Sequence, residues 1–429
     1  MRGGTIFALG SGQVPAALGV VRISGAHAAR AVQALAGSLP APRHASLRRL
    51  RDPVDGSTLD HALVLWFPGP GSATGEDCAE LHCHGGRAVI AAVSRALVAQ
   101  GLRAAEPGEF TRRAFANGRL DLAEVEGLGD LLAAETELQR LSAQAMADGA
   151  LSCAAEQWRS GVLALSAEIE ALLDFSDEDD VGARADALPA GLAARAAALA
   201  ASVGEWLDRP RAEPLREGFR VVLAGPPNAG KSTLFNALIE SDGAIVSPEP
   251  GTTRDVLVAS VATEGVPFSF VDTAGLRDEG AGAIEAIGIA RALEQTRRAD
   301  LVLWLGPEGE GPTDRPVIEV SAQCDREGGK TAGLRVSAVT GEGMADLRMK
   351  LLRHARSALP QPGMAALNRR QADCLVPVRE SLLALAGESD GLIAAEHLRV
   401  ARRGIDALVG RADTEAMLDS LFGRFCIGK

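Results

Sequence analysis

The apolar and polar positions of residues 1–117 alternate in short runs. Strand-like runs lie at residues 5–10, 19–25, 61–67 and 76–86, with Gly and Pro turns between them. A helical pattern covers residues 88–100 and ends at Gly101. The pattern therefore predicts a mixed α/β domain over this part of the chain.

Helical spacing of apolar residues dominates two later regions. Residues 120–175 form long Ala, Leu and Glu segments without proline, and a further Ala-rich helix is expected over 186–207. Residues 364–422 have the same spacing. The acidic run at 177–180 is better explained as a solvated loop than as a metal site. We expect the helical regions to pack together.

Strands and helices alternate between these two regions, over residues 219–357. Strands are expected at 219–225, 256–263, 266–275, 300–306, 316–322 and 334–341, and helices near 231–240, 285–297 and 344–357. Such alternation predicts a mostly parallel sheet with helices on both faces. The second and third strands are expected to form a hairpin at Glu264-Gly265.

The predicted fold is a multidomain α/β protein in which an α/β nucleotide domain is inserted into a helical domain. The expected boundaries are 1–118 for the N-terminal α/β domain and 218–357 for the nucleotide domain. The helical domain would combine 119–217 with 358–429, because polar, Pro-containing linkers lie near both junctions.

Composition narrows the class of protein. The chain has 429 residues, of which 47% are hydrophobic and 23% charged, and a net charge of −12. No run is long enough for a membrane span and no signal peptide is evident, so a cytosolic protein is expected. The six cysteines lack C-x-x-C spacing, which argues against a disulfide framework or a zinc site. The acidic balance argues against binding nucleic acid mainly through phosphates.

A phosphate-binding motif lies at the centre of the chain. Gly225 to Ser232 fits G-x-x-x-x-G-K-[ST] between an apolar strand and a helix. Gly225 and Gly230 allow the loop to close, Lys231 supplies positive charge, and Ser232 offers a metal-binding hydroxyl. The alternative, a surface Gly/Pro turn, loses ground when the next motifs are counted.

Two further motifs follow in the order that a GTPase requires. PGTTRD at 250–255 offers hydroxyls from Thr252 and Thr253, and FVDTAG at 270–275 brings Asp272 to the Mg²⁺. The backbone N–H of Gly275 would approach the γ-phosphate. The domain therefore resembles the translation-factor-type GTPases, which have a Ras-like P-loop fold.

The group that orients the attacking water differs from that of Ras-like enzymes. Leu276 stands where those enzymes have a glutamine. Glu285 is the nearest candidate, although an ordinary first-turn acid at a helix N-terminus is also possible. Asn228 could ligate a monovalent cation or simply form the turn, and local chemistry leaves both readings open.

The guanine-reading motif is altered. Ala322-Gln323-Cys324-Asp325 stands in place of N-K-x-D, so Asp325 retains the acceptor for guanine while the Asn and Lys are missing. We expect guanine preference to survive with weakened affinity, helped by the loop at Ser337-Ala338.

The flanking motifs point to one family. They are GVVRISG (19–25), TGEDCAELHCHGG (74–86), PGEFTRRAFANGRLDL (107–122) and the terminal CIGK (426–429), taken together with GPPNAGKST, PGTTRD and DTAGLR of the nucleotide domain. The second and third of these motifs and the terminal CIGK are not general GTPase features. With them the whole chain resembles the MnmE (TrmE) family of tRNA-modification GTPases. The resemblance implies an N-terminal domain that binds 5-formyl- or 5,10-methylene-tetrahydrofolate and forms a homodimer. It also implies K⁺-dependent pairing of the GTPase domains and C5 modification of the tRNA wobble uridine with the FAD-dependent partner MnmG (GidA).

The same resemblance, with the motifs above, gives a set of site residues. Candidate GTP contacts are Asn228, Ala229, Gly230, Lys231, Ser232, Thr233, Ser247, Thr252, Thr253, Asp272, Thr273, Ala274, Gly275, Asp325, Ser337 and Ala338. Ser232 and Thr253 would bind Mg²⁺, and Glu285 would orient the water. K⁺ would be bound by Asn228, Ser247, Thr252 and a backbone oxygen of Glu249. The implied folate contacts are Arg22, Glu80, Arg119 and Lys429.

Three residues outside these sets could carry chemistry. Cys426 could be a nucleophile in the modification reaction, a folate-site ligand or a small apolar anchor, and buried packing is favoured because no charge partner is evident. His82 and His84 share one face of a strand, and we interpret them as structural or folate-proximal without a metal.

Three functions compete at this point. The favoured one is a GTPase subunit of a tRNA-modifying enzyme. A ribosome-assembly or regulatory GTPase acting as a binding module would need a basic RNA-binding domain, which the charge of −12 disfavours. A structural protein with an inactive nucleotide site is favoured only by the altered base-reading motif.

Overall fold

A computed structural model describes residues 4–175, 188, 191–240, 257–273, 293–325, 333–411, 418, 421–423 and 425–428. The chain divides into two compact units. Unit 1 consists of Met1–Gly129 and Val409–Lys429, and unit 2 is Asp130–Leu408. The three-domain division expected from the sequence stays a prediction.

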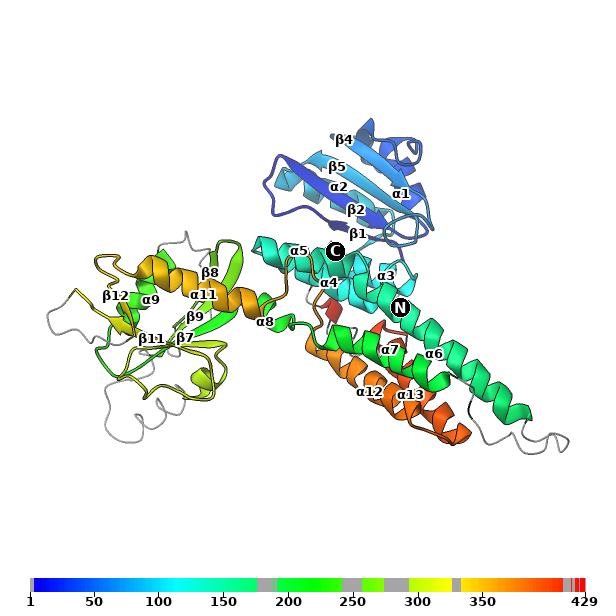
Figure 1. Cartoon of the computed structure of the whole chain (residues 1–429). Coiled ribbons are helices and arrows are strands. Elements are labelled where there is room, and N and C mark those ends of the chain that lie inside the picture. The colour runs from blue at the N-terminus through cyan, green and yellow to red at the C-terminus, as the bar shows by residue number, and fades with distance from the viewer. Residues whose placement is uncertain are drawn as a thin grey trace, which may run out of the picture. The chain divides into compact units, whose positions relative to one another are not determined.

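Unit 1 is built on a six-stranded sheet of order β3-β4-β5-β2-β1-β6 (Figure 1). Neighbouring strands are antiparallel except β1 and β6. The elements are β1 (Ile6–Leu9), β2 (Leu18–Ser24), α1 (Ala28–Ala36), β3 (Ser46–Arg51), β4 (Thr58–Phe67), β5 (Cys78–His84), α2 (Arg87–Ala99), β6 (Arg103–Ala104), α3 (Glu109–Ala116) and α4 (Leu122–Ala133). The predicted α/β pattern is thus confirmed.

The two faces of this sheet differ in polarity. Because side chains alternate along a strand, Val21 and Leu81 point to one face and Arg22 and Glu80 to the other. The first face is fully buried with residues of α1 and α2. The second face carries the charged and histidine side chains of β2 and β5. It is the face on which the candidate site is built.

The C-terminal residues belong to unit 1. Phe422 and Phe425 are buried with Val125 of α4. Ile427 forms an isolated antiparallel bridge with Pro107. This packing keeps the last described residues beside the N-terminal sheet.

Unit 2 contains a second six-stranded sheet, of order β12-β11-β10-β7-β9-β8 (Figure 1). All neighbours are parallel except β8 and β9, which form the predicted hairpin. Glu264 and Gly265 make its turn with positive φ angles of 47° and 76°. Its elements are β7 (Phe219–Ala224), α9 (Lys231–Glu240), β8 (Leu257–Thr263), β9 (Val266–Asp272), β10 (Leu301–Trp304), β11 (Val317–Ala322), β12 (Leu334–Val336) and α11 (Met344–Ala358).

In the described part of unit 2, α6 (Ala150–Phe175), α7 (Leu192–Leu207), α12 (Arg369–Ala386) and α13 (Gly391–Leu408) form a helix bundle (Figure 1). In it α12 packs on α7 and α13, and α13 packs on α6. Two shorter helices, α5 (Glu137–Ala147) and α8 (Glu213–Glu217), contact β9 of the sheet. Among the described helices, none is long and apolar enough to cross a membrane.

One predicted helix is shorter than expected, and other elements were not anticipated. The helix placed at 186–207 begins at Leu192, because Leu188 precedes a proline and Gly191 holds a left-handed φ of 80°. Helices α1 and α3 and strand β3 had no expectation. In β3, Leu47 is exposed while Leu50 is buried, so its leucines do not mark a single face.

Candidate functional site

The phosphate-binding loop joins β7 to α9. Gly225 and Gly230 have φ angles of 146° and 91°, which side-chain-bearing residues rarely adopt. Asn228 lies in the left-handed region at 60°, a conformation that asparagine tolerates, so its turn-forming role is present. The Lys231 ammonium donates to the carbonyl oxygens of Gly225 at 3.0 Å and Pro226 at 2.8 Å. The predicted cradle is therefore formed.

A hydroxyl and a carboxylate meet beside this loop. Ser232 Oγ donates to Asp272 Oδ2 at 2.7 Å, which joins the start of α9 to the end of β9. Asp272 is fully buried, and the neighbouring Thr273 hydroxyl donates to the Leu223 carbonyl at 2.7 Å. An oxygen pair of this kind is the donor set that Mg²⁺ prefers, so Ser232 and Asp272 fit a magnesium site.

The altered base-reading segment reaches the loop. Gln323 has a positive φ of 65°, and its amide nitrogen would lie 3.2 Å from a Cβ added at Gly230. The Cys324 N–H donates to the Val336 carbonyl at 3.3 Å, which brings Asp325 beside the loop that begins at Ser337. The two predicted base-contacting segments are thus adjacent.

Eleven of the eighteen predicted nucleotide-site residues are described, and the other seven are not. Asn228, Ala229, Gly230, Lys231, Ser232, Thr233, Asp272, Thr273, Asp325, Ser337 and Ala338 lie around the loop or the base-reading segments. Ser247, Glu249, Thr252, Thr253, Ala274, Gly275 and Glu285 lie outside the described residues, as does Lys429. Their roles stay predictions.

Unit 1 holds a cavity of about 440 Å³ on the polar face of its sheet. Ligand pockets of proteins have volumes of about 300–1,000 Å³, so this one admits a cofactor-sized molecule. Its walls come from β2, β4, β5, α3 and the loop before β5. Its lining includes Arg22, Arg43, Phe67, Thr74, Glu80 and Phe110.

An ion pair crosses the floor of the cavity. Arg22 and Glu80 are directly opposite each other on β2 and β5, and Arg22 Nε donates to Glu80 Oε1 at 3.2 Å. Glu80 Oε2 is 3.0 Å from His82 Nε2. The C-terminal tail reaches the same arginine, because an Arg22 guanidinium nitrogen donates to the Gly428 carbonyl at 3.4 Å. Arg119 is exposed beside Gly75 and is not among the described residues that line the cavity.

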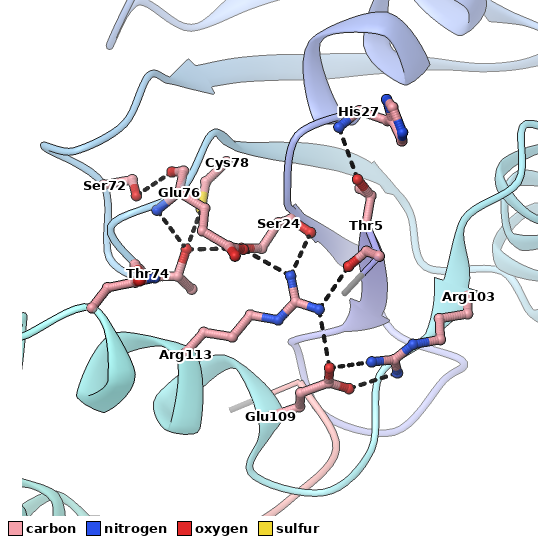
Figure 2. A network of polar contacts seen from close by, with 12 residues as sticks. Thr5, Ser24, His27, Ser72, Thr74, Glu76, Cys78, Arg103, Glu109 and Arg113 are labelled. Atoms are coloured by element: carbon pink, nitrogen blue, oxygen red, sulfur yellow. Dashed lines mark hydrogen bonds and ion pairs between the residues drawn. The ribbon is translucent and has the colours of Figure 1, made fainter. Parts of the chain in front are cut away.

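A network of charged and polar side chains surrounds Arg113 and includes the cavity-lining Thr74 (Figure 2). The Arg113 guanidinium, 9% exposed, donates to Glu76 Oε2 at 2.7 Å and to Glu109 Oε1 at 3.1 Å. Another of its bonds, at 2.7 Å, goes to the Gly4 carbonyl. The Ser24 hydroxyl donates to the same Glu76 oxygen at 2.8 Å. Arg113 therefore ties α3 to β2 and to the loop that carries the cavity-lining Thr74.

The charges of this network stabilise one another. Burial raises the pKa of Glu109, but hydrogen bonds from Arg103, the Glu106 backbone and Arg113 outweigh it and hold that pKa below its usual value. The hydrogen bond to Glu109 raises the pKa of Arg103. Glu76, Glu109 and Arg113 fall within the motifs that indicated the family, yet the sequence analysis assigned them no role. These charged residues could have been noticed because the GTPase chemistry does not explain the motifs that contain them.

The exposure of Cys426 differs from the prediction. Cys426 is exposed, so the favoured interpretation as a buried anchor is wrong. Phe422 and Phe425 supply that anchor instead.

Burial, with a nearby Asp60 charge, raises the pKa of Cys83 to about 12. The two predicted strand histidines do share a face, and His84 Nδ1 lies 2.7 Å from Asp60 Oδ1.

Comparison with known proteins identifies the family. Residues 5–119 match the model for the GTP-binding protein TrmE N-terminus, and residues 122–426 match the model for the MnmE helical domain. A protein named tRNA modification GTPase MnmE from Novosphingobium aromaticivorans is 64% identical, with 99% of both chains covered. The chain belongs to the MnmE family. A second MnmE of the same name, from Erythrobacter litoralis, is 60% identical over 99% of this chain and 100% of its own.

The MnmE family assignment agrees with the fold described above. The sequence resemblance is therefore confirmed, as is the multidomain α/β fold with a P-loop GTPase domain. Among solved structures, the G domain of the T. maritima FeoB iron transporter is 26% identical and covers 32% of this chain and 98% of its own. Its TM-score of 0.23 is too low to support any inference about this member of the MnmE family.

Proposed function

We propose that this protein is a GTP-hydrolysing enzyme of the cytoplasm that takes part in modifying C5 of the tRNA wobble uridine. The observation that carries the proposal is the formed phosphate-binding loop with the Ser232–Asp272 oxygen pair at 2.7 Å. The name and near-complete coverage of the curated relatives support tRNA modification as the process. The net charge of −12 argues against a ribosome-assembly role, which would need a basic RNA-binding domain.

In the proposed GTPase site, each residue has a distinct task. Lys231 leaves its two carbonyl acceptors and turns to the phosphates of GTP. Ser232 and Thr253 would hold Mg²⁺, which would neutralise negative charge on the phosphates of GTP. Asn228 would ligate K⁺ together with residues 247–252, and Glu285 would orient the attacking water. GTP hydrolysis would then depend on pairing of two GTPase domains.

The cavity of unit 1 is the proposed site for a one-carbon tetrahydrofolate. Glu80 offers a carboxylate that can accept from the N–H groups of a pterin, and Arg22 sits 3.2 Å from it. A folate also carries a glutamate, which requires a cation near the cavity mouth. We further propose a homodimer that acts with the FAD-dependent partner MnmG, with Cys426 exposed for modification chemistry.

Turnover with different monovalent cations tests the GTPase assignment. We expect GTP hydrolysis in K⁺ to exceed that in Na⁺, and Glu285→Ala to abolish turnover while leaving GTP binding intact. Glu308→Ala is the matched control, since Glu308 is an exposed glutamate of the same unit. Full turnover by the Glu285 variant would refute its role.

Analysis of tRNA nucleosides tests the process. A deletion strain should lose the C5 group of the wobble uridine and regain it when the gene is restored. Unchanged wobble-uridine modification in the deletion strain would refute the tRNA assignment.

A further inference from the structure

An unusually basic segment borders the cavity. Residues 42–51 contain four arginines and one histidine but no Asp or Glu, in a chain whose net charge is −12. Most of this segment is the edge strand β3, and edge strands often carry charge to prevent pairing with other chains. That explanation does not cover Arg43, which precedes the strand and lines the cavity.

Arg43 is held at the rim of the cavity. It adopts a left-handed φ of 63°, which is an unfavourable conformation for a residue with a side chain. Its guanidinium lies 5.8 Å from the centre of the Phe67 ring and donates to the Gly71 carbonyl. Phe67 and Gly71 both line the cavity. The strained backbone thus directs a cation to the mouth of the pocket.

Two further arginines continue from this point along the same face. Alternation along β3 places Leu47, Arg49 and Arg51 on the polar face of the sheet, and all three are exposed. Arg49 donates to His61 Nε2 at 3.2 Å and Arg51 to the Gly56 carbonyl at 3.3 Å. Within the described part of unit 1, neither they nor Arg43 form a salt bridge with a carboxylate. Three cations on one face are therefore available to an anionic ligand.

The spacing of these cations suits an extended chain. The Arg43 N–H bonds to the Trp66 carbonyl and Arg49 lies opposite His61, so they are separated by about 16 Å at 3.3 Å per strand residue. Leu47 is exposed between them. A ligand that alternates carboxylates with methylene groups would match this series of charged and apolar side chains.

We infer that the Arg43–Arg49–Arg51 track binds a poly-γ-glutamate extension of the folate that occupies the cavity. The inference rests on the proposed folate function. The track begins at a cavity-lining residue, which favours an extension of the bound small molecule over a nucleic acid. It also lacks exposed aromatic side chains at positions 47, 49 and 51, on which bases would stack.

Affinity for two folates tests the inference. Isothermal titration of the full chain would compare 5-formyltetrahydrofolate as the monoglutamate and as the pentaglutamate, at low salt. From the strength of exposed ion pairs, we expect the pentaglutamate to bind roughly 2- to 30-fold more tightly. Arg49→Gln/Arg51→Gln should bring this ratio close to one without changing monoglutamate affinity. Added salt should lower the ratio in the unmodified protein because exposed charges are screened.

A matched variant controls for net charge. Arg30 and Arg95 are exposed on α1 and α2, the helices that cover the opposite face, and their double Gln variant should keep the full ratio. Equal affinity of the unmodified protein for both folates would overturn this inference alone. An equal loss of the affinity ratio in the control variant would also overturn it. So would an Arg49/Arg51 variant that loses tRNA binding but keeps the affinity ratio. Failure of both folates to bind would refute the folate function as well.

Discussion

Replacing Arg113 tests whether the buried network holds the cavity wall in place. Arg113→Met preserves much of the side-chain length but removes every donor of the guanidinium, which bonds Glu76, Glu109 and Gly4. Removing one partner of a buried ion pair costs about 3–5 kcal/mol, because the remaining charge is left without compensation. Glu109 keeps its bond to Arg103, and the Glu76 side chain is 33% exposed. We therefore expect the free energy of unfolding of unit 1 to fall by about 3 kcal/mol, near the lower limit of this range.

Hydrogen exchange measured by mass spectrometry resolves this effect within one unit. The free energy of opening of amides in β2 and β5 should fall by the expected amount in Arg113→Met. The matched control is Arg140→Met, since Arg140 and Glu137 form an exposed pair with side chains 50% and 61% exposed. Such a pair contributes little to stability, because solvent screens both charges.

A double variant separates the cost of the lost hydrogen bonds from the cost of leaving a charge uncompensated. Glu76→Gln added to Arg113→Met should recover part of the stability, because a neutral amide is less costly to leave unpaired than a carboxylate. If the free energy of opening fell by less than about 1 kcal/mol in Arg113→Met, the structural role of Arg113 would be refuted. An equal fall in Arg140→Met would refute it as well.

Three other predictions concern single groups. Ser232→Ala should raise the Mg²⁺ concentration for half-maximal GTP hydrolysis by roughly tenfold or more, whereas Ser232→Thr should leave it close to that of the unmodified protein. Because the folded-state pKa of Glu109 is lowered, its stabilisation of unit 1 is present above about pH 4.5 and lost as pH falls through the folded value. Glu109→Gln should therefore flatten the acid dependence of hydrogen exchange in β2, and an unchanged slope would contradict this. Maleimide labelling at pH 7.5, followed by peptide mass analysis, should modify Cys426 and spare Cys83, whose pKa is about 12; labelling of Cys83 in the folded protein would contradict it.

The nucleotide site could be predicted from sequence because its parts are local. A loop closed by Gly225 and Gly230 needs only the strand before it and the helix after it. Asp272 ends the strand paired with β7, so sheet order alone brings it to Ser232. The parallel sheet and the 264–265 hairpin followed from the same local patterns.

The chemistry of unit 1 could not be read in this way, because it depends on strand register. Arg22 meets Glu80 only because β2 and β5 pair with these residues opposite each other. A slip of one residue would turn one of them to the buried face. Arg113 meets Glu76 across a loop, which no sequence spacing encodes. The Cys426 error has a related cause, since aromatic residues of the tail took the buried positions.

The packing of Phe422 and Phe425 against α4 has a consequence for how the chain is made. Unit 1 is assembled from the two ends of the sequence, and Asp130–Leu408 is synthesised between them. At roughly 5–20 residues per second, this insertion of roughly 280 residues delays the closing segment by roughly 14–56 s on the ribosome. The N-terminal sheet must wait for that time with the surface for its final segment uncovered. If translation ended before this last segment was made, the chain would therefore have a folded nucleotide domain and an incomplete N-terminal unit.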